Sequence, residues 1–542
     1  MFKNHPRGLH VLFFTEMWER FAYYLMLGIF VLYMTDSERN GLGYTETFAN
    51  EIYGTFLALV YLTPFVGGIL ADRFLGYRKS VVIGGLLMAV GYLGLGMLSG
   101  WWPFLISLGL VIIGNGFFKP NISSIVGRLY KDGSSLKDSG YNIFYMGINI
   151  GAFVCNFIAA ILRNRFGWGW AFSAAGIGMI IGVIWFLRGQ DDLEGASDRG
   201  DGSDVEPGIL LKLSLQLFLP SVVAGVVGFL LAAQYDLGQF LTPTTTAFMF
   251  AVIPILIYYF VLWLGASREE KGPIAALLAI FGVVIIFWMV FHQNGNTLTL
   301  WARDHSHRQA GALAPVQRAL QLNEIAPDSY WTNLPPNERP APGTEVSLIS
   351  TEIMQSINPG FIILFTPLVV SGFAFLRSRK KEPSTPAKIA YGLGITGVSA
   401  LLMVLAVRSA PTYNGDLGKV TLTWLIGTYG IITIGELFLS PMGLSLVSKL
   451  APARLTGLMM GGWFLSTAIG NKMAGVVGGL WERVDSLETI FWINALSAFG
   501  AAAMIAMMVP WIRRVMAEHE QRVNQRNSLA EAETAPESAS AG

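Results

Sequence analysis

Long apolar stretches recur along the whole chain of 542 residues, separated by shorter polar connections. A helical stretch of about 20 residues is long enough to cross the roughly 30 Å hydrocarbon core of a bilayer. The pattern predicts about fourteen such helices, which are too long and too numerous to be core helices of a soluble fold. They cover approximately residues 8–34, 50–72, 80–98, 103–125, 141–162, 168–187, 209–233, 243–265, 273–301, 349–376, 388–407, 419–447, 456–479 and 488–512. We therefore expect an all-α membrane protein.

Polar stretches between these helices divide the chain into units. The stretch between the sixth and seventh spans is rich in Asp, Gly and Ser, which is typical of a flexible linker. The next two spans carry no intramembrane charge pair, and we expect them to form a hairpin outside the working core. The predicted units are 1–188, a six-helix bundle; 189–208, a cytoplasmic linker; 209–266, the inserted hairpin; 267–514, a second six-helix bundle with an external loop at 302–348; and 515–542, a cytoplasmic tail.

Composition agrees with a membrane protein. The chain is 53% hydrophobic and 13% charged, whereas about a quarter of the residues of a soluble domain are charged. The net charge of +1 gives no basic surface, so we expect no nucleic-acid partner. Cys155 is the single cysteine, which excludes an intramolecular disulfide.

Lys and Arg in the connections predict the orientation. With an even number of crossings, the basic connections lie on the same side as the basic N-terminus. Such residues favour the cytoplasmic side, so both termini are expected in the cytoplasm, the first helix being an uncleaved anchor. Arg163 and Arg165 fall on the opposite side and contradict the rule in part.

Three charges fall inside the first span. Each ionised side chain near the bilayer centre costs roughly 2.5–3.5 kcal/mol on insertion scales. Helical spacing puts Glu16, Glu19, Arg20 and Tyr23 on one face of the helix. A face with three charged groups is too costly to expose to the hydrocarbon of the bilayer. This face is expected to line a polar cavity between helices; the alternative is an internal ion pair that only fixes packing.

The two halves of the chain carry opposite intramembrane charges. Lys119 lies in an apolar span of the first half, and Glu436 is an acidic residue deep in the second half. This arrangement suits a zwitterion with separated termini, or a gate that closes by pairing across the cavity. Asn149 and Asn358 add amide groups to the same spans, although either could serve as a helix–helix hydrogen bond.

The chain has no module that would energise transport with ATP, because no Gly-x-x-x-x-Gly-Lys-Ser/Thr motif is present. No nucleophile–base or metal constellation indicates an enzyme, and His305 and His307 are expected to be solvated loop residues, not metal ligands. The two halves therefore indicate a secondary transporter. The segment with Asp72 and Arg73 resembles the conformational loop between helices two and three of the major facilitator superfamily, which implies two six-helix bundles rocking about a midplane site.

Several motifs in order make the resemblance more specific. Glu16-x-x-Glu19-Arg20-Phe21 resembles the helix-one signature of the proton-dependent oligopeptide transporter family, and Phe144-Tyr145-x-x-Ile148-Asn149-x-Gly151 resembles its helix-five signature. Further similarities occur at Lys119, Asn358-Pro359, Glu436 and Trp463, so the resemblance covers nearly the whole chain. It implies the arrangement of six, two and six helices found in bacterial members.

The resemblance also implies roles for individual residues. Glu436, Asn149 and Asn358 would hold the amino terminus of a peptide, while Arg20 and Lys119 would face its carboxylate. Glu16 and Glu19 would exchange protons, and their protonation would free Arg20 or Lys119 for the substrate. Aromatic residues would shape the side-chain pockets, although helix packing alone also accounts for each of them: Tyr23, Tyr24, Tyr61, Trp288 and Trp463.

Two departures from the family pattern occur together. Many members have an Arg two turns after the helix-one signature and a Glu on helix seven that pairs with it, where this chain has Leu27 and His292. A histidine titrates near neutral pH, so His292 is a candidate proton site, and the alternative is a neutral hydrogen-bonded ring. From the sequence we expect His292→Gln to shift or abolish the pH dependence of uptake. The helix-two His of mammalian-type members is replaced by Gly54.

The resemblance implies a proton-coupled symporter that imports di- and tripeptides by alternating access across a bacterial inner membrane. Short peptides, protons and the lipid bilayer are the expected partners, with no cofactor besides the coupling proton. The alternative is a related carrier for another small solute, such as nitrate or an amino-acid conjugate, although Glu436 would repel a bare anion. A membrane receptor or scaffold would not require buried charges in both bundles.

Overall fold

The described part of the protein is built almost entirely from long helices. A computed structural model describes residues 5–130, 136–195, 214–235, 242–332, 334–339, 344, 346–413, 415–452 and 455–534. Residues 196–208 of the predicted linker and 535–542 of the predicted tail lie outside them. The long helices are α1 (Gly8–Thr35), α2 (Glu46–Leu70), α3 (Tyr77–Met97), α4 (Trp101–Arg128), α5 (Lys137–Phe166), α6 (Trp168–Arg188), α8 (Leu219–Gln234), α9 (Pro243–Leu264), α10 (Arg268–Phe291), α13 (Ile357–Ser378), α14 (Thr385–Ser409), α15 (Thr423–Leu450), α16 (Thr456–Gly478) and α17 (Glu488–Thr534).

The expectation of an all-α membrane protein is confirmed. Eleven helices within the described residues are long and apolar enough to cross a membrane. Helices α1, α2 and α16 are not among these eleven, and α1 carries the three charges noted above. The number of about fourteen spans therefore stays a prediction, as do the boundaries of the predicted units.

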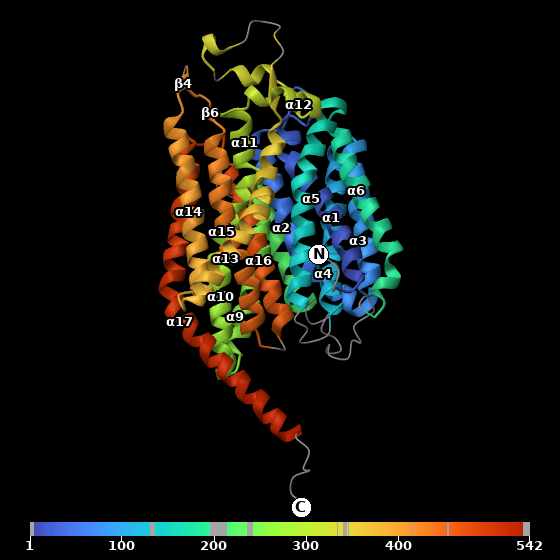
Figure 1. Ribbon diagram of the computed structural model, residues 1–542, viewed down its shortest axis with the longest axis vertical. Coiled ribbons are helices and arrows are strands. Elements are labelled where there is room, and N and C mark those ends of the chain that lie inside the picture. The colour runs from blue at the N-terminus through green and yellow to red at the C-terminus, as the bar shows by residue number, and fades with distance from the viewer. Residues whose placement is uncertain are drawn as a thin grey trace, which may run out of the picture.

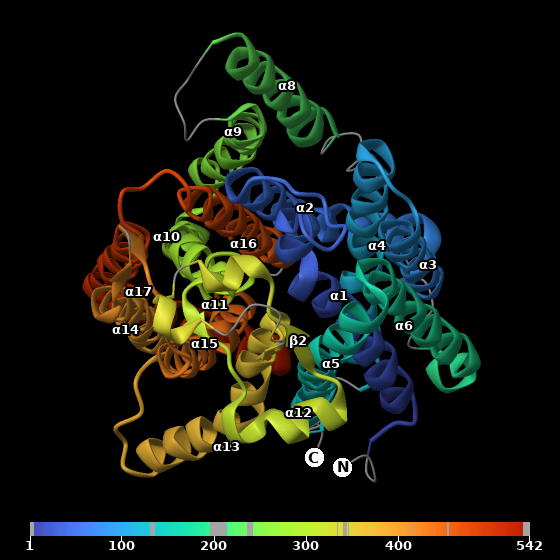
Figure 2. The same ribbon diagram turned by 90° about the horizontal axis from the view of Figure 1, so that it is seen from above.

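The helices gather in two groups with a hairpin at the edge. Figure 2 shows α1–α6 on one side and α10 with α14–α17 on the other, while α8 and α9 lie outside them next to α2 and α16. Each group has its own buried apolar cluster. The cavity described below lies where the two groups meet.

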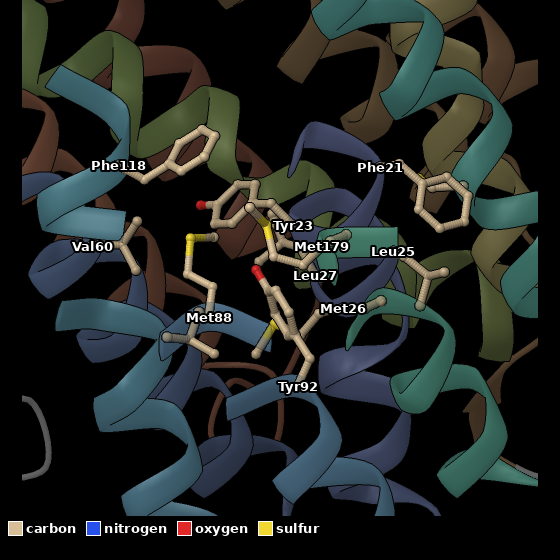
Figure 3. Packing of buried hydrophobic residues seen from close by; sticks show 14 of the residues in the cluster. Phe21, Tyr23, Leu25, Met26, Leu27, Val60, Met88, Tyr92, Phe118 and Met179 are labelled. Carbon is tan, nitrogen blue, oxygen red and sulfur yellow. The ribbon is translucent and has the colours of Figure 1, made fainter. Parts of the chain in front are cut away.

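Helix α1 runs through the core of the first group. Tyr23 and Leu27 on α1 pack among Met88 and Tyr92 of α3 and Phe118 of α4 (Figure 3). All five side chains are buried. This packing fixes the rotation of α1, and so determines which of its faces meets the second group.

The predicted span at 273–301 is interrupted. Helix α10 ends at Phe291, a 3-10 turn η4 (His292–Gly295) follows, and the short helix α11 (Thr297–Asp304) resumes the direction. Asn296 leaves helical geometry, with φ −125° and ψ −86°, and its side chain accepts a hydrogen bond from the backbone N–H of Thr297 at 2.7 Å. Residue 292 therefore begins a 3-10 turn inside the membrane-spanning stretch Arg268–Asp304, which contains the predicted span at 273–301.

The predicted loop at 302–348 is structured in its described parts. It contains α12 (Ala314–Leu320) and three short strands, β1 (Ser306–His307), β2 (Asn323–Ile325) and β3 (Ser347–Ile349). Strands β2 and β3 pair antiparallel, and β1 pairs in parallel with β6 (Val420–Thr421). Figure 1 shows this cap at one end of the helices and the extension of α17 at the other. We call the two ends the loop end and the tail end.

Candidate functional site

A cavity of about 290 Å³ lies between the two groups of helices. Its walls come from α1, α2, α4 and α5 on one side and from α10, α13, α15 and α16 on the other. Its volume is near the lower end of the roughly 300–1,000 Å³ of small-molecule sites. All ten residues predicted to bind substrate line it: Arg20, Tyr23, Tyr24, Tyr61, Lys119, Asn149, Trp288, Asn358, Glu436 and Trp463.

The charges of α1 form a buried ion cluster at the cavity wall. The Arg20 guanidinium contacts Glu19 through two nitrogens, with Nη2 at 2.6 Å from Oε1, and its Nε lies 3.4 Å from Oε1 of Glu16. Glu16 lines the cavity, whereas Glu19 is fully buried and does not. Arg20 is thus held by two carboxylates, and Glu16 makes the longer contact.

Lys119 on α4 is differently placed. Among the described residues its ammonium enters no ion pair within 4 Å, and its Nζ lies 4.3 Å from the centre of the Tyr61 ring. A cation over an aromatic face is stabilised without being neutralised. Lys119 is therefore available to an anionic group in the cavity, whereas Arg20 is already occupied.

Glu436 on α15 faces the cavity from the second group. The side-chain amide of Asn358 donates to Oε2 of Glu436 at 3.1 Å and to Oγ1 of Thr433 at 2.9 Å. No basic side chain of the described residues forms an ion pair with Glu436. Asn149 on α5 donates to the backbone carbonyl of Tyr145 at 3.0 Å, so its carbonyl oxygen remains for other donors.

Several polar atoms of the lining have no hydrogen-bond partner in the described residues. Buried polar atoms are normally paired with protein, water or ligand. These atoms surround the cavity from both groups of helices, so a bound solute would find donors and acceptors on every side. They are Glu16 Oε2, Tyr23 Oη, Asn156 Oδ1, Trp288 Nε1, Asn294 Oδ1 and Ser440 Oγ.

The two departures from the family pattern meet at the same cavity. Leu27 and His292 both line it. Nδ1 of His292 lies 3.1 Å from the Trp288 carbonyl oxygen, and its ring packs against Trp288, Phe291 and Tyr61. No carboxylate of the described residues forms an ion pair with this ring.

Comparison with known proteins identifies the family. The chain matches the model described as the POT family over residues 78–320 and 344–493. It is 32% identical to a di-/tripeptide transporter of Lactococcus lactis subsp. lactis, over 90% of this chain and 92% of that protein. The chain belongs to the POT family. It is also 30% identical to the uncharacterized transporter YclF of Bacillus subtilis, over 95% of this chain and 96% of that one.

The fold agrees with this membership. A crystal structure of the peptide transporter POT in complex with sulfate superposes with a TM-score of 0.78 at 29% identity, covering 95% of this chain and 97% of that one. The expected major facilitator fold is confirmed. As a member of the POT family, the chain is a multi-pass membrane transporter and not an enzyme.

One predicted element of this POT-family chain is only partly described. Residues Ala71–Leu75 form a π-helical turn, and Gly76 after it has φ 75°, a conformation that favours glycine. The side chains of Asp72 and Arg73 lie outside the description, so their predicted role in a conformational loop stays a prediction.

The two helix groups touch closely at the loop end. A Cβ on Gly54 of α2 would lie 2.7 Å from the Cα of Gly475 on α16, so the two backbones are in contact. Asn50 donates to the Gly478 carbonyl at 3.2 Å, and Nζ of Lys472 donates to Thr55 Oγ1 at 2.7 Å. Sequence reasoning missed Lys472, although a lysine inside the apolar span 456–479 was a sufficient signal.

A second buried ion cluster joins α5 to the cap. Arg163 lies 3.1 Å from Glu352 and 3.2 Å from Glu324, which also contacts Arg308 at 2.8 Å and Arg39 at 2.9 Å. Burial would raise the pKa of Glu324, but the three arginines together hold it well below its usual range. The cluster explains why Arg163 departs from the charge rule: it pairs within the protein.

Breaking this cluster should destabilise the protein. Arg163→Gln leaves the fully buried Glu352 without a cationic partner in the described residues, and such a loss costs about 3–5 kcal/mol. Thermal unfolding in detergent should show a clear fall in Tm. The matched control is Arg408→Gln, which removes the exposed pair with Glu488 and should cost only about 0–1 kcal/mol. Equal effects of the two variants would contradict a buried cluster.

Proposed function

We propose that this POT-family chain imports di- and tripeptides together with protons by alternating access, across a bacterial inner membrane and with both termini in the cytoplasm. The observation that carries the proposal is the pair of Lys119 and Glu436 on opposing walls of one cavity, opposite charges that form no ion pair with any of the described residues. The relative from Lactococcus lactis is named a di-/tripeptide transporter, which supports the substrate class.

The substrate's charged ends fit these two walls. A peptide carboxylate would meet the Lys119 ammonium, and a peptide ammonium would meet Glu436 with the amide oxygen of Asn149. Aromatic rings of the lining would accept side chains of varied shape without specific hydrogen bonds. Such a site recognises termini, so the length of a peptide matters more than its sequence.

Proton coupling would act through Glu16. Its contact with Arg20 is the longer of the two carboxylate contacts, and its Oε2 has no partner in the described residues. Protonation of Glu16 removes one of the two charges that hold Arg20. The guanidinium would then turn toward the substrate carboxylate, so that proton and peptide favour the same state. No cofactor besides the proton is needed.

Alternating access would require the loop end to open. In this structure α2 and α16 are in contact there, and the cluster around Arg163 ties α5 to the turn that precedes α13. Opening separates these contacts while those at the tail end form. The proposal thus makes the loop end the external gate.

Uptake of a labelled dipeptide into proteoliposomes with an imposed pH gradient tests the proposal. Accumulation should follow an inward proton gradient and should be inhibited by unlabelled di- and tripeptides but not by nitrate or single amino acids. Uptake that ignores the gradient would refute coupling. Inhibition by nitrate or an amino-acid conjugate, with none by peptides, would refute the substrate class.

The surroundings of His292 yield a separate prediction. Its ring contacts aromatic side chains and one backbone carbonyl, and no carboxylate of the described residues pairs with it. We therefore expect His292→Gln to leave the pH profile of uptake unchanged, because no carboxylate of the described residues is placed to pair with an imidazolium at this position. Uptake measured from acidic to neutral external pH decides the question. A shifted or flattened profile would make His292 a proton site.

A further inference from the structure

A second cavity lies between the hairpin and the helix groups. Its volume is about 590 Å³, and we call it the hairpin groove. It is enclosed by α8 and α9 on the outside and by α2 and α16 on the inside. Figure 2 shows α8 as the outermost helix, next to α9.

The groove is continuous with the membrane-facing surface. Val222 and Val226 of α8 line it and are 63% and 53% exposed. Only 17% of the most apolar part of α8, and the same share of α9, is buried inside the protein. Helices so little covered in a membrane-spanning chain are surrounded by hydrocarbon, so lipid has direct access to the groove.

The polar groups of the lining are mostly used within the protein. Tyr259 Oη donates to the Leu458 carbonyl at 2.6 Å, Thr63 Oγ1 to the Ile112 carbonyl at 3.0 Å, and Thr55 Oγ1 to the Glu51 carbonyl at 2.8 Å. A buried water needs two to four polar partners. The groove offers too few for water to fill it, which favours an apolar occupant.

A buried hydroxyl of the lining has no such partner among the described residues. Ser221 on the first turn of α8 is 9% exposed, and its Oγ has no hydrogen-bond partner in the described residues. It lies near the tail end of the groove, together with Leu217. A hydroxyl there would donate a hydrogen bond to the ester carbonyl at the head of an acyl chain. A plain hydrocarbon has no such carbonyl, so the hydroxyl favours an esterified chain.

The length of the groove fits one leaflet. Its lining on α2 extends from Thr55 to Val66, about 16 Å at 1.5 Å per residue. Half of the roughly 30 Å hydrocarbon core is about 15 Å. An acyl chain anchored at Ser221 would therefore reach from the leaflet at the tail end to about the bilayer midplane.

We propose that the hairpin groove binds one acyl chain of a phospholipid from the leaflet at the tail end, with the Ser221 hydroxyl donating to the ester carbonyl. The bound chain contacts the back of the substrate cavity, because Tyr61 and Phe464 line both spaces. The Lys119 ammonium lies over the ring of Tyr61, 4.3 Å from its centre. The inserted hairpin is thus a lipid-binding element next to the site.

Photocrosslinking tests the proposal. The full-length protein is reconstituted with phosphatidylglycerol that carries a photoreactive group near the end of one acyl chain. We expect crosslinks on α2 near Thr55 and Leu59, at the midplane end of the groove. Val222→Trp, which fills the groove, should reduce them several-fold, whereas Val223→Trp, on the same helix, 54% exposed and outside the groove lining, should not.

Native mass spectrometry gives the second measurement. The wild type and Val223→Trp should retain one phospholipid that Val222→Trp loses, and Ser221→Ala should retain it less well. Crosslinks spread evenly over the membrane-facing helices, or equal retention by all variants, would overturn the proposal. Neither readout involves a peptide or a proton, so failure of the proposed transport function would leave this result standing.

Discussion

Glu16→Gln is expected to abolish proton-driven accumulation of a dipeptide while exchange of dipeptide across the membrane continues. A gradient of one pH unit supplies about 1.4 kcal/mol per proton, or about tenfold accumulation for each proton coupled. Glutamine has nearly the shape of a protonated glutamate and cannot release a proton. Arg20 would remain held by Glu19 alone, so the substrate-binding state would form irrespective of pH.

The measurement compares two assays on the same proteoliposomes. Gradient-driven uptake reports coupling, and counterflow against unlabelled dipeptide reports binding and the movement of the carrier. Glu488→Gln is a suitable control. That carboxylate forms a partly exposed ion pair with Arg408 and does not line the cavity. Gradient-driven accumulation that survives in Glu16→Gln would exclude Glu16 as the coupling group. Loss of both assays would indicate a folding or binding defect instead.

The sequence predicted the members of the site because intramembrane charge is rare. Glu16, Lys119 and Glu436 each interrupt an apolar span, and burial in lipid is too costly for any of them. Opposing helix groups must then bring such residues together, and all three line one cavity. Their partners were less predictable: spacing alone did not distinguish Glu16, on the cavity wall, from Glu19, buried behind Arg20.

The cluster around Arg163 was beyond sequence reasoning for a different reason. Glu324 belongs to a strand of the cap, and its pairing with Arg163 depends on how β2 and β3 fold back over α5. Periodicity reports local structure and carries no information on such distant pairs. The break after α10 was missed because averaging over an apolar span hides one irregular residue such as Asn296.

Glu436→Gln is expected to weaken the binding of a dipeptide roughly ten- to hundredfold, since a hydrogen bond to a charged group contributes about 1.5–3 kcal/mol. In this structure Glu436 is oriented by Asn358 and enters no ion pair in the described residues, so its charge is directed at the cavity. The loss should appear in the apparent affinity measured by competition with labelled dipeptide. Gln at this position keeps the hydrogen-bonding shape, so folding should be preserved.

An N-acetylated dipeptide separates the role of the charge from that of the fold. This ligand lacks the ammonium group, so it should bind the wild type weakly and lose little more in Glu436→Gln. The coupling between the two changes should then account for most of the loss. Thr428→Ala is the control on the same helix: Thr428 lies outside the cavity lining and its hydroxyl donates to the Trp424 carbonyl, so the change should affect both ligands only slightly. If Glu436→Gln weakened the binding of both ligands equally, the carboxylate would stabilise the structure around α15 and would not bind the amino terminus of the substrate. The model in which the cavity binds a zwitterion would then be wrong.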